Sequence, residues 1–535
     1  MANKAVPQIL QIGSLRLNGF LSKHGVANFL NIPYAQIPAR FKTAVLYDPA
    51  SLTGDLDASD YGPRCPQPAD PIHGVMQNMF ERLSSEQYPS EFDCLHLNIY
   101  VPPDFEHLRE RLPVFAYIHG GAFNCGDNTT EFDGNHLVKR SMELNSPIII
   151  VTINYRLNVL GFMSSRELAA EAQATGDVVI RNQGLNDQRL ALQWIQSHIH
   201  HFGGDQSRVT LSGESAGAAS VIYHLKGADA LFRQAIIQST PCPQLRSLDE
   251  SQAVFDKLVR SAGVEPSAPA AVKLAALRSL PVDSLIAAAD IPGPSFPIED
   301  PNWFADNEQS IENPAQYWGS VAPWCSRVII GHTKDEAALF YLPSVKSLTE
   351  TELTQTLGEL FKDDRIVSSL LNTQLFRSAP SPLRALIAYC TRQVFQWPTQ
   401  SIAQTMSGQG QKVYVYSIDV EDPFPGLLQG FVWHSFGVPV MFYQPSCQKH
   451  QQLKITTDMM SEKHIDFIYG KEPWEEFGVA GRKWSWNGQD SGLIDVESMT
   501  DDVLAQLEEK SLRECYLQRS QLLLEHSVHM QFTAQ

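Results

Sequence analysis

The segment that most constrains the fold runs from Val209 to Tyr223, where an apolar strand leads into Gly-Glu-Ser-Ala-Gly at residues 213–217 and then into a helical stretch. A serine on so tight a strand-to-helix turn is held in a strained backbone conformation. Glycines two residues to either side are needed because a side chain there would collide with neighbouring backbone. The turn lifts the Ser215 hydroxyl out of the sheet, at a helix amino terminus that favours negative charge.

A second turn of small residues, Gly120-Gly121-Ala122, follows an apolar run at residues 114–118. Small residues let the backbone approach a substrate carbonyl. The N–H groups of Gly121, Ala122 and Ala216 are then positioned to bind an oxyanion, and losing one such donor typically costs roughly 3 to 4 kcal/mol in the transition state. This turn and the serine turn together predict a nucleophile elbow with an oxyanion hole, and Gly120 supports the same site.

Strand-like apolar runs alternate with helix-like stretches through the first half of the chain, which is typical of a parallel sheet covered by helices. The runs at residues 114–118 and 148–153 are apolar on both faces, as in buried parallel strands. The expected strands are residues 114–118, 148–153, 209–212, 327–330 and 413–416, with a helix at 185–201.

The predicted fold class is therefore α/β, a single domain over residues 1–535 with a central, mostly parallel sheet flanked by helices. After about residue 245 the chain becomes rich in Ala, Ser, Pro and Leu. This composition predicts helical insertions at roughly 245–320 and 345–410 that form a cap. The composition of residues 501 to about 531 predicts one long helix that ends the fold.

The net charge of −18, from 41 Lys and Arg against 59 Asp and Glu, argues against a nucleic-acid or anionic-membrane partner. Hydrophobic residues make up 43% and charged residues 19%, a globular mixture.

No apolar run reaches the roughly 18 to 20 residues that a membrane span needs. The amino terminus shows no secretory signal, so we expect a cytoplasmic protein, or a secreted one if an upstream signal was removed.

Eight cysteines in 535 residues are too sparse for a disulfide framework. None of them has the Cys-x-x-Cys spacing of a structural zinc site. We therefore expect neither a metal nor an organic cofactor.

Further segments complete a resemblance to the type-B carboxylesterase, cholinesterase and lipase family of α/β hydrolases, in particular to intracellular carboxylesterases of fungi. The resemblance runs from near the amino terminus to the expected final helix. It implies the α/β-hydrolase fold with a cap over an active-site gorge. The segments are Phe29-Leu-Asn-Ile-Pro-Tyr-Ala35, Glu91-Phe-Asp-Cys-Leu-His-Leu-Asn98, Asn154-Tyr-Arg156, Asn182-Gln-Gly-Leu-Asn-Asp-Gln188 and Phe202-Gly-Gly-Asp205.

The resemblance also implies the base and the acid of a catalytic triad. Seven histidines follow Ser215, and the family's loop pattern selects His434 in His434-Ser-Phe-Gly-Val-Pro439. The acid loop Gly331-His-Thr-Lys-Asp-Glu336 selects Glu336 over its neighbour Asp335. The implied triad is Ser215, His434 and Glu336.

Two positions depart from the family pattern. Gly437 replaces the acid that is usual three residues after the histidine, and Val440 replaces a tyrosine. Both changes predict a different orientation of His434 and a reshaped pocket wall. Glu214 resembles the family's glutamate before the nucleophile, which shapes the field around the triad; a purely structural carboxylate is the alternative.

Cys65 and Cys94 occupy the positions of the family's first disulfide, and in a reducing cytosol both the oxidised and the reduced states stay open. The loop between them has no tryptophan for cation–π binding of a quaternary ammonium group, which disfavours a cholinesterase. That loop contains an apolar stripe at helical spacing, from Val75 to Leu83, which is typical of core packing or of a lid over the gorge.

The resulting hypothesis is a serine carboxylic-ester hydrolase that acts through an acyl-enzyme on small, apolar esters. One alternative is acyl transfer or thioester release in a metabolic or biosynthetic pathway. Another is a non-catalytic binding protein on the same fold, which the presence of all three triad residues disfavours. The sequence does not indicate the acyl group, the alcohol group or the oligomeric state.

Overall fold

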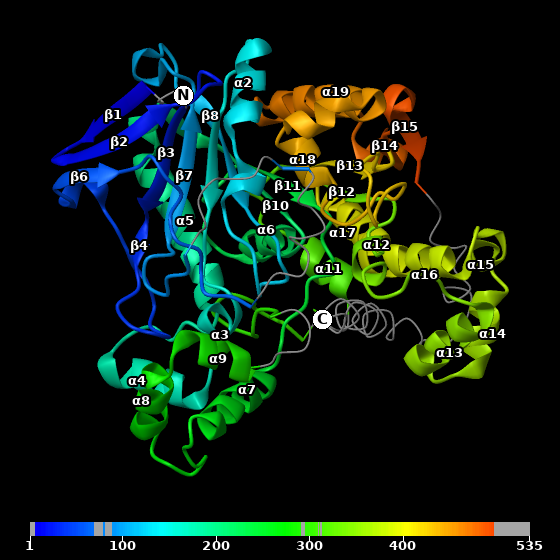
Figure 1. Cartoon of the computed structure of the whole chain (residues 1–535), viewed down its shortest axis with the longest axis horizontal. Helices are drawn as coiled ribbons and strands as arrows, with labels where there is room; N and C mark the ends of the chain where they lie inside the picture. The colour runs from blue at the N-terminus through cyan, green and yellow to red at the C-terminus, as the bar shows by residue number, and fades with distance from the viewer. Residues whose placement is uncertain are drawn as a thin grey trace.

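The computed structural model describes residues 6–68, 79–80, 88–289, 295–308, 310 and 313–496 (Figure 1). Its strands are β1 Val6–Ile12, β2 Leu15–Leu21, β3 Ala27–Pro33, β4 Ala35–Gln36, β5 Val45–Leu46, β6 Gly54–Asp57, β7 His96–Val101, β8 Leu112–Ile118, β9 Ile149–Ile153, β10 Gly204–Glu214, β11 Gln234–Gln238, β12 Arg327–Thr333, β13 Lys412–Ile418, β14 Arg482–Trp486 and β15 Gly492–Asp495. Its helices are α2 Asn135–Glu143, α3 Asn158–Gly161, α4 Arg166–Thr175, α5 Gln183–His198, α6 Ala216–Lys226, α7 Leu248–Ser261, α8 Ala270–Ser279, α9 Val282–Ala289, α11 Pro314–Gly319, α12 Ala338–Tyr341, α13 Glu350–Phe361, α14 Asp364–Leu371, α15 Gln374–Ser378, α16 Pro382–Thr391, α17 Trp397–Gly408, α18 Gly437–Met441, α19 Gln451–Ile468 and α20 Phe477–Ala480.

One large sheet forms the centre of the described part of the chain. Its strand order is β1-β2-β3-β7-β9-β8-β10-β11-β12-β13-β14-β15, with β6 paired to β2. Neighbours from β9 to β14 are parallel, whereas those from β1 to β9 and the last pair, β14 with β15, are antiparallel. The predicted α/β class with a mostly parallel sheet is confirmed, and the antiparallel amino-terminal extension is a feature that the sequence did not predict.

The central strands are apolar because helices cover both of their faces. Every residue of β8 and β9 is buried, as expected for parallel strands without a solvated face. Figure 1 shows α2 and α19 along one side of the sheet and α6 and α17 along the other. The strands predicted at residues 114–118 and 148–153 and the helix predicted at 185–201 are confirmed to within a few residues.

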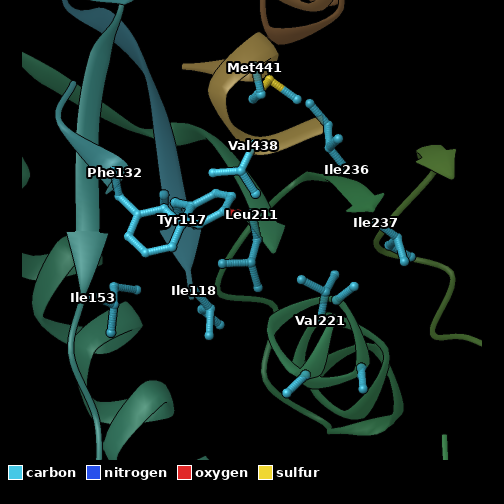
Figure 2. Close-up of a cluster of buried hydrophobic side chains, with 14 of the residues drawn as sticks. Tyr117, Ile118, Phe132, Ile153, Leu211, Val221, Ile236, Ile237, Val438 and Met441 are labelled. Atoms are coloured by element: carbon cyan, nitrogen blue, oxygen red, sulfur yellow. The ribbon is translucent and has the colours of Figure 1, made fainter. Parts of the chain in front are cut away.

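Buried apolar side chains pack between the sheet and the helices beside it. Figure 2 shows Tyr117, Leu211 and Ile236 from three neighbouring strands, with Val221 of α6 and Val438 of α18 close to them. All five side chains are buried. This packing fixes the sheet against the helix that follows Ser215 and the helix that follows His434.

The register of the sheet brings distant segments to one edge. Ile118 at the end of β8 pairs with Gly213 near the end of β10, and β11, β12 and β13 continue in the same direction. Because the carboxyl ends of parallel strands lie at one edge, the loops after β8, β10, β12 and β13 meet there.

The two regions predicted as helical insertions lie between neighbouring strands of the sheet. Helices α7, α8, α9 and α11 connect β11 to β12, and helices α12 to α17 connect β12 to β13. In the described residues, no helix combines the length and apolar character that crossing a membrane requires. The stripe from Val75 to Leu83 lies mostly outside the described residues, and the predicted helix at 501–531 lies outside them entirely.

A buried ion pair braces the loop after β9. Arg156 and Asp187 are 2% and 0% exposed, and they are joined by hydrogen bonds of 2.6 and 2.7 Å. The guanidinium also donates to the carbonyl of Lys42 and to Gln183. The pair therefore ties the loop after β9 to helix α5 and to the segment before β5.

Candidate active site

Ser215, the predicted nucleophile, lies in the turn between β10 and α6. Its backbone has φ 58° and ψ −121°, which places a residue with a side chain in the left-handed region of φ. Such strain is held by the surrounding structure and is common at functional sites. The Ser215 N–H donates to the carbonyl of Gln238 at 3.0 Å, which fixes the turn to the end of β11.

The glycines around Ser215 have the steric role that the sequence predicted. A Cβ on Gly213 would lie 2.3 Å from the Gly217 carbonyl oxygen, and a Cβ on Gly217 would lie 2.1 Å from the Ile118 carbonyl oxygen. Neither contact is tolerable, and both involve backbone that cannot move cheaply. The prediction that side chains would collide with backbone here is confirmed.

The turn after β8 lies directly beside Ser215. A Cβ on Gly120 would come within 3.1 Å of the Ser215 Cβ. The next three residues, Gly121, Ala122 and Phe123, have φ of 102°, 56° and 61°. The carbonyl of Gly121 accepts hydrogen bonds from the N–H groups of Asn124 and Cys125, which closes the turn.

The predicted oxyanion donors are available. Within the described residues, the N–H groups of Gly121, Ala122 and Ala216 donate to no protein acceptor. Ala216 is the first residue of α6, whose N–H has no partner inside the helix. The arrangement offers unpaired donors next to Ser215, which is what an oxyanion would need.

Ser295, which the sequence analysis did not identify, binds the turn that carries the Gly121 and Ala122 N–H groups. Its N–H donates to the carbonyl of Ala122 at 3.0 Å, and its Oγ donates to Asn124 Oδ1 at 2.5 Å. Ser295 is fully buried. The segment that contains Ser295, far along the chain from the turn, therefore holds the turn in its left-handed conformation. No sequence pattern predicts this contact.

His434 and Glu336 meet at the carboxyl edge of the sheet. The distance from His434 Nδ1 to Glu336 Oε2 is 2.6 Å, and both side chains are buried. The other oxygen of Glu336 accepts the Thr333 N–H at 2.7 Å. An acceptor-only carboxylate holds the Nδ1–H tautomer of a neutral imidazole, which leaves the Nε2 lone pair free.

Asp335, the carboxylate that the family's acid loop did not select, contacts another loop. Its Oδ2 accepts the Val432 N–H at 3.0 Å, and its own N–H donates to the Val432 carbonyl at 2.9 Å. Asp335 therefore anchors the loop that carries His434, whereas Glu336 contacts the ring.

The Nε2 atom of His434 lies beside Glu214. It is 3.3 Å from Glu214 Oε1 and has no hydrogen-bond partner in the described part of the chain, Ser215 included. The same Glu214 oxygen accepts a hydrogen bond of 2.7 Å from the Ser435 hydroxyl. Ser215, Glu214, Glu336 and His434 are thus gathered at one place, without a hydrogen bond between Ser215 and His434 in this state.

Burial and charge shift the pKa values of this group. Burial raises the pKa of Glu214 to about 7, against the opposing charge of His434 and the hydrogen bond from Ser435. Burial alone would lower the pKa of His434, but the charges of Glu214 and Glu336 outweigh it and raise that pKa. Perturbed titration of paired buried groups is typical of functional sites.

Two aromatic rings flank His434. The ring centroids of Phe340 and Phe395 lie 5.1 and 5.0 Å from the imidazole centroid. Phe395 belongs to a π-helical stretch, Arg392–Gln396, between α16 and α17. Such a stretch often marks a functional position, and here it presents an apolar surface to the histidine.

Cys65 and Cys94, the pair for which the resemblance left both redox states open, lie next to each other in the interior. Cys65 and Cys94 are buried free thiols. Their mutual hydrogen bond, together with burial, raises the pKa of Cys94, and Cys65 Sγ accepts the Leu157 N–H at 3.3 Å. Among the described residues, no cluster of three His, Cys, Asp or Glu side chains could hold a metal ion.

Comparisons with known proteins agree with this architecture. Residues 9–492 match the model of the carboxylesterase family. The chain is 34% identical over 358 residues to lipase 2 of Diutina rugosa, an alignment that covers 61% of each chain. It is 29% identical over 439 residues to the para-nitrobenzyl esterase of Bacillus subtilis, covering 79% of this chain and 80% of that one.

The matched region spans about three fifths of the length of the Diutina rugosa lipases. Among solved structures, a thermophilic para-nitrobenzyl esterase superposes with a TM-score of 0.71 at 24% identity, covering 95% of this chain and 99% of that chain. That likeness shows a shared fold, the α/β-hydrolase fold. Since the family model matches most of the sequence, the chain belongs to the carboxylesterase family.

Proposed function

We propose that this chain is a serine carboxylic-ester hydrolase with Ser215, His434 and Glu336 as its triad. The observation that carries the proposal is the 2.6 Å hydrogen bond between His434 Nδ1 and Glu336 Oε2, which leaves Nε2 of a buried imidazole without a hydrogen bond near Ser215. Relatives named lipase and esterase support the same reaction class.

In the first half of the reaction, His434 Nε2 takes the Ser215 proton while Ser215 Oγ attacks the ester carbonyl carbon. The carbonyl π electrons move to its oxygen, and the N–H groups of Gly121, Ala122 and Ala216 bind that oxyanion. Glu336 stabilises the imidazolium through Nδ1. Apo hydrogen bonds of this kind are often long and tighten only with substrate, so the free Nε2 is compatible with the role of base.

In the second half, the tetrahedral intermediate collapses and the imidazolium gives its proton to the leaving alcohol. Ser215 then carries the acyl group as an ester. Water, deprotonated by His434, attacks this acyl-enzyme and forms a second tetrahedral intermediate. As it collapses, the His434 imidazolium returns the proton to Ser215 Oγ, and the carboxylic acid leaves.

The proposed substrates are small esters with apolar groups. The rings of Phe340 and Phe395 lie 5.1 and 5.0 Å from the His434 imidazole, which must give the leaving group its proton. Apolar rings at that position exclude water and favour an apolar alcohol or acyl group over a charged one.

The test is hydrolysis of p-nitrophenyl esters from acetyl to decanoyl by the wild type, by Ser215→Ala and by Ser279→Ala as an exposed serine control. We expect turnover by the wild type and the control, and a loss of at least about 10³-fold in Ser215→Ala. A fluorophosphonate should label Ser215 alone. Labelling without ester turnover would favour transfer to another acyl acceptor, and the absence of both would favour a binding role.

A further inference from the structure

Ser435, the residue after His434, is the second strained serine at this site. Its φ is 71°, in the left-handed region where glycine is favoured. The turn is closed by a hydrogen bond of 3.0 Å from the Val438 N–H to the Ser435 carbonyl. A glycine would make the same turn without strain, so the serine side chain must be held there by another contact.

That contact is with Glu214. Ser435 Oγ donates to Glu214 Oε1 at 2.7 Å, and this same oxygen lies 3.3 Å from His434 Nε2. The second oxygen of Glu214 faces Gly120, where a Cβ would approach to 2.8 Å. The buried carboxylate is therefore held between two loops, and Ser435 fixes the oxygen that faces the histidine.

We propose that Ser435 is a positioning residue of the reaction. Its hydroxyl fixes the Glu214 carboxylate against His434 Nε2, so that Glu214 keeps the imidazole aligned and stabilises the imidazolium that forms when Ser215 loses its proton. This inference rests on the proposed hydrolase function. In the described residues the Ser435 hydroxyl donates to Glu214 and not to Ser215, so it acts through Glu214.

The charges around Glu214 and His434 link the Ser435 hydrogen bond to the pKa of His434, which a pH profile measures. The ionisable side chains whose charge acts on Glu214 are His434, Glu336 and Glu131, and the hydroxyls of Tyr117 and Tyr416 lie in its field. On His434 the acting charges are Glu214 and Glu336. A hydrogen bond to the charged form of a carboxylate favours ionisation. Without the Ser435 hydroxyl, Glu214 ionises less readily and stabilises protonated His434 less.

The experiment compares Ser435→Gly and Ser435→Ala, which lose the same hydroxyl but differ in backbone strain. We expect kcat to fall roughly tenfold in both, because a hydrogen bond to a charged group is lost, and KM to stay within about twofold. The acid limb of the pH profile of kcat/KM should move to lower pH. Ser435→Gly should melt above Ser435→Ala, because both lose the hydroxyl but only the glycine relieves the backbone strain.

Lys362→Gly is the matched control for strain. Lys362 ends α13 at φ 50° and is exposed, and α13 lies away from the central sheet (Figure 1). Its replacement should raise stability and leave kcat unchanged. A second comparison places Ser435→Gly in a Glu214→Gln background, where the serine change should alter kcat by less than about twofold, since the negative charge that the hydroxyl positions is gone.

A wild-type kcat in Ser435→Gly, or an acid limb that stays in place, would overturn the inference and leave Ser435 as a turn residue. An undiminished tenfold effect in the Glu214→Gln background would also overturn it. If Ser435→Ala does not fold, Ser435→Gly still decides the question. Failure of the hydrolase proposal is recognised separately, since the wild type would then be as inactive as Ser215→Ala.

Discussion

Asp335 and Glu336 are adjacent in the chain, yet their carboxylates bind different partners: Asp335 accepts the Val432 N–H, and Glu336 binds the His434 ring. We expect Glu336→Gln to lower kcat by about 10³ to 10⁴-fold, because an amide cannot hold the imidazole tautomer. Asp335→Asn keeps an oxygen for Val432 and should change kcat by less than about threefold. Steady-state hydrolysis by the two variants checks this, and similar losses in both would show that Glu336 is not the acid.

The pH profile is a second prediction. Burial lowers the pKa of His434, but Glu214 and Glu336 together raise it above its ordinary value. Since the base must be neutral, the acid limb of kcat/KM should have its midpoint above pH 6.5. Glu214→Gln removes one of the two carboxylates and should shift that limb to lower pH. A wild-type midpoint below pH 6.5 would contradict the assignment.

The steric role of the elbow glycines can be tested by stability. Gly217→Ala would place a Cβ 2.1 Å from the Ile118 carbonyl oxygen, and we expect it to destabilise the protein by more than about 2 kcal/mol. Gly358 is also helical, but a Cβ there meets nothing within 4 Å. Gly358→Ala should therefore stabilise by about 0.5 to 1 kcal/mol. Urea unfolding of both variants measures the contrast.

The ion pair between Arg156 and Asp187 should matter far more than a surface pair. Asp187→Asn leaves a guanidinium buried without its counter-charge, and we expect a loss of about 3 kcal/mol. Lys334 and Glu421 form an exposed pair at 3.8 Å, so Glu421→Gln should cost less than about 0.5 kcal/mol. Equal shifts in the denaturation midpoints of the two variants would refute this reasoning.

The sequence predicted the parts of the fold that have a strong local pattern. The buried strands β8 and β9 are continuous apolar runs, and α5 has helical periodicity, so local chemistry was sufficient. The antiparallel strands at the amino terminus were not predicted, because strands with one partly exposed face, such as β1 and β2, are not continuous apolar runs. Neither did the sequence predict which strands would be neighbours, since that depends on long-range packing.

The residues of the site also divide into those with a local sequence pattern and those placed by long-range packing. Ser215 could be predicted from the residues around it, because the strand, the glycines and the helix adjoin it in the chain. His434 and Glu336 needed a family resemblance, since 98 residues separate them and neither has a distinctive local setting. Ser435 and Ser295 could not be predicted, because a hydroxyl that bonds to a distant side chain leaves no periodic trace in the sequence.

The alignment of β8 with β10, in which Ile118 lies opposite Gly213, also sets limits on how this chain can change over evolution. One residue along a strand is about 3.3 Å, more than the length of a hydrogen bond, so inserting or deleting a single residue in either strand would separate Ser215 from its neighbouring N–H donors. The helices between β11 and β13 carry no such alignment. Diversification of substrate choice should therefore proceed by lengthening and rebuilding those connections while the strand ends remain fixed in length.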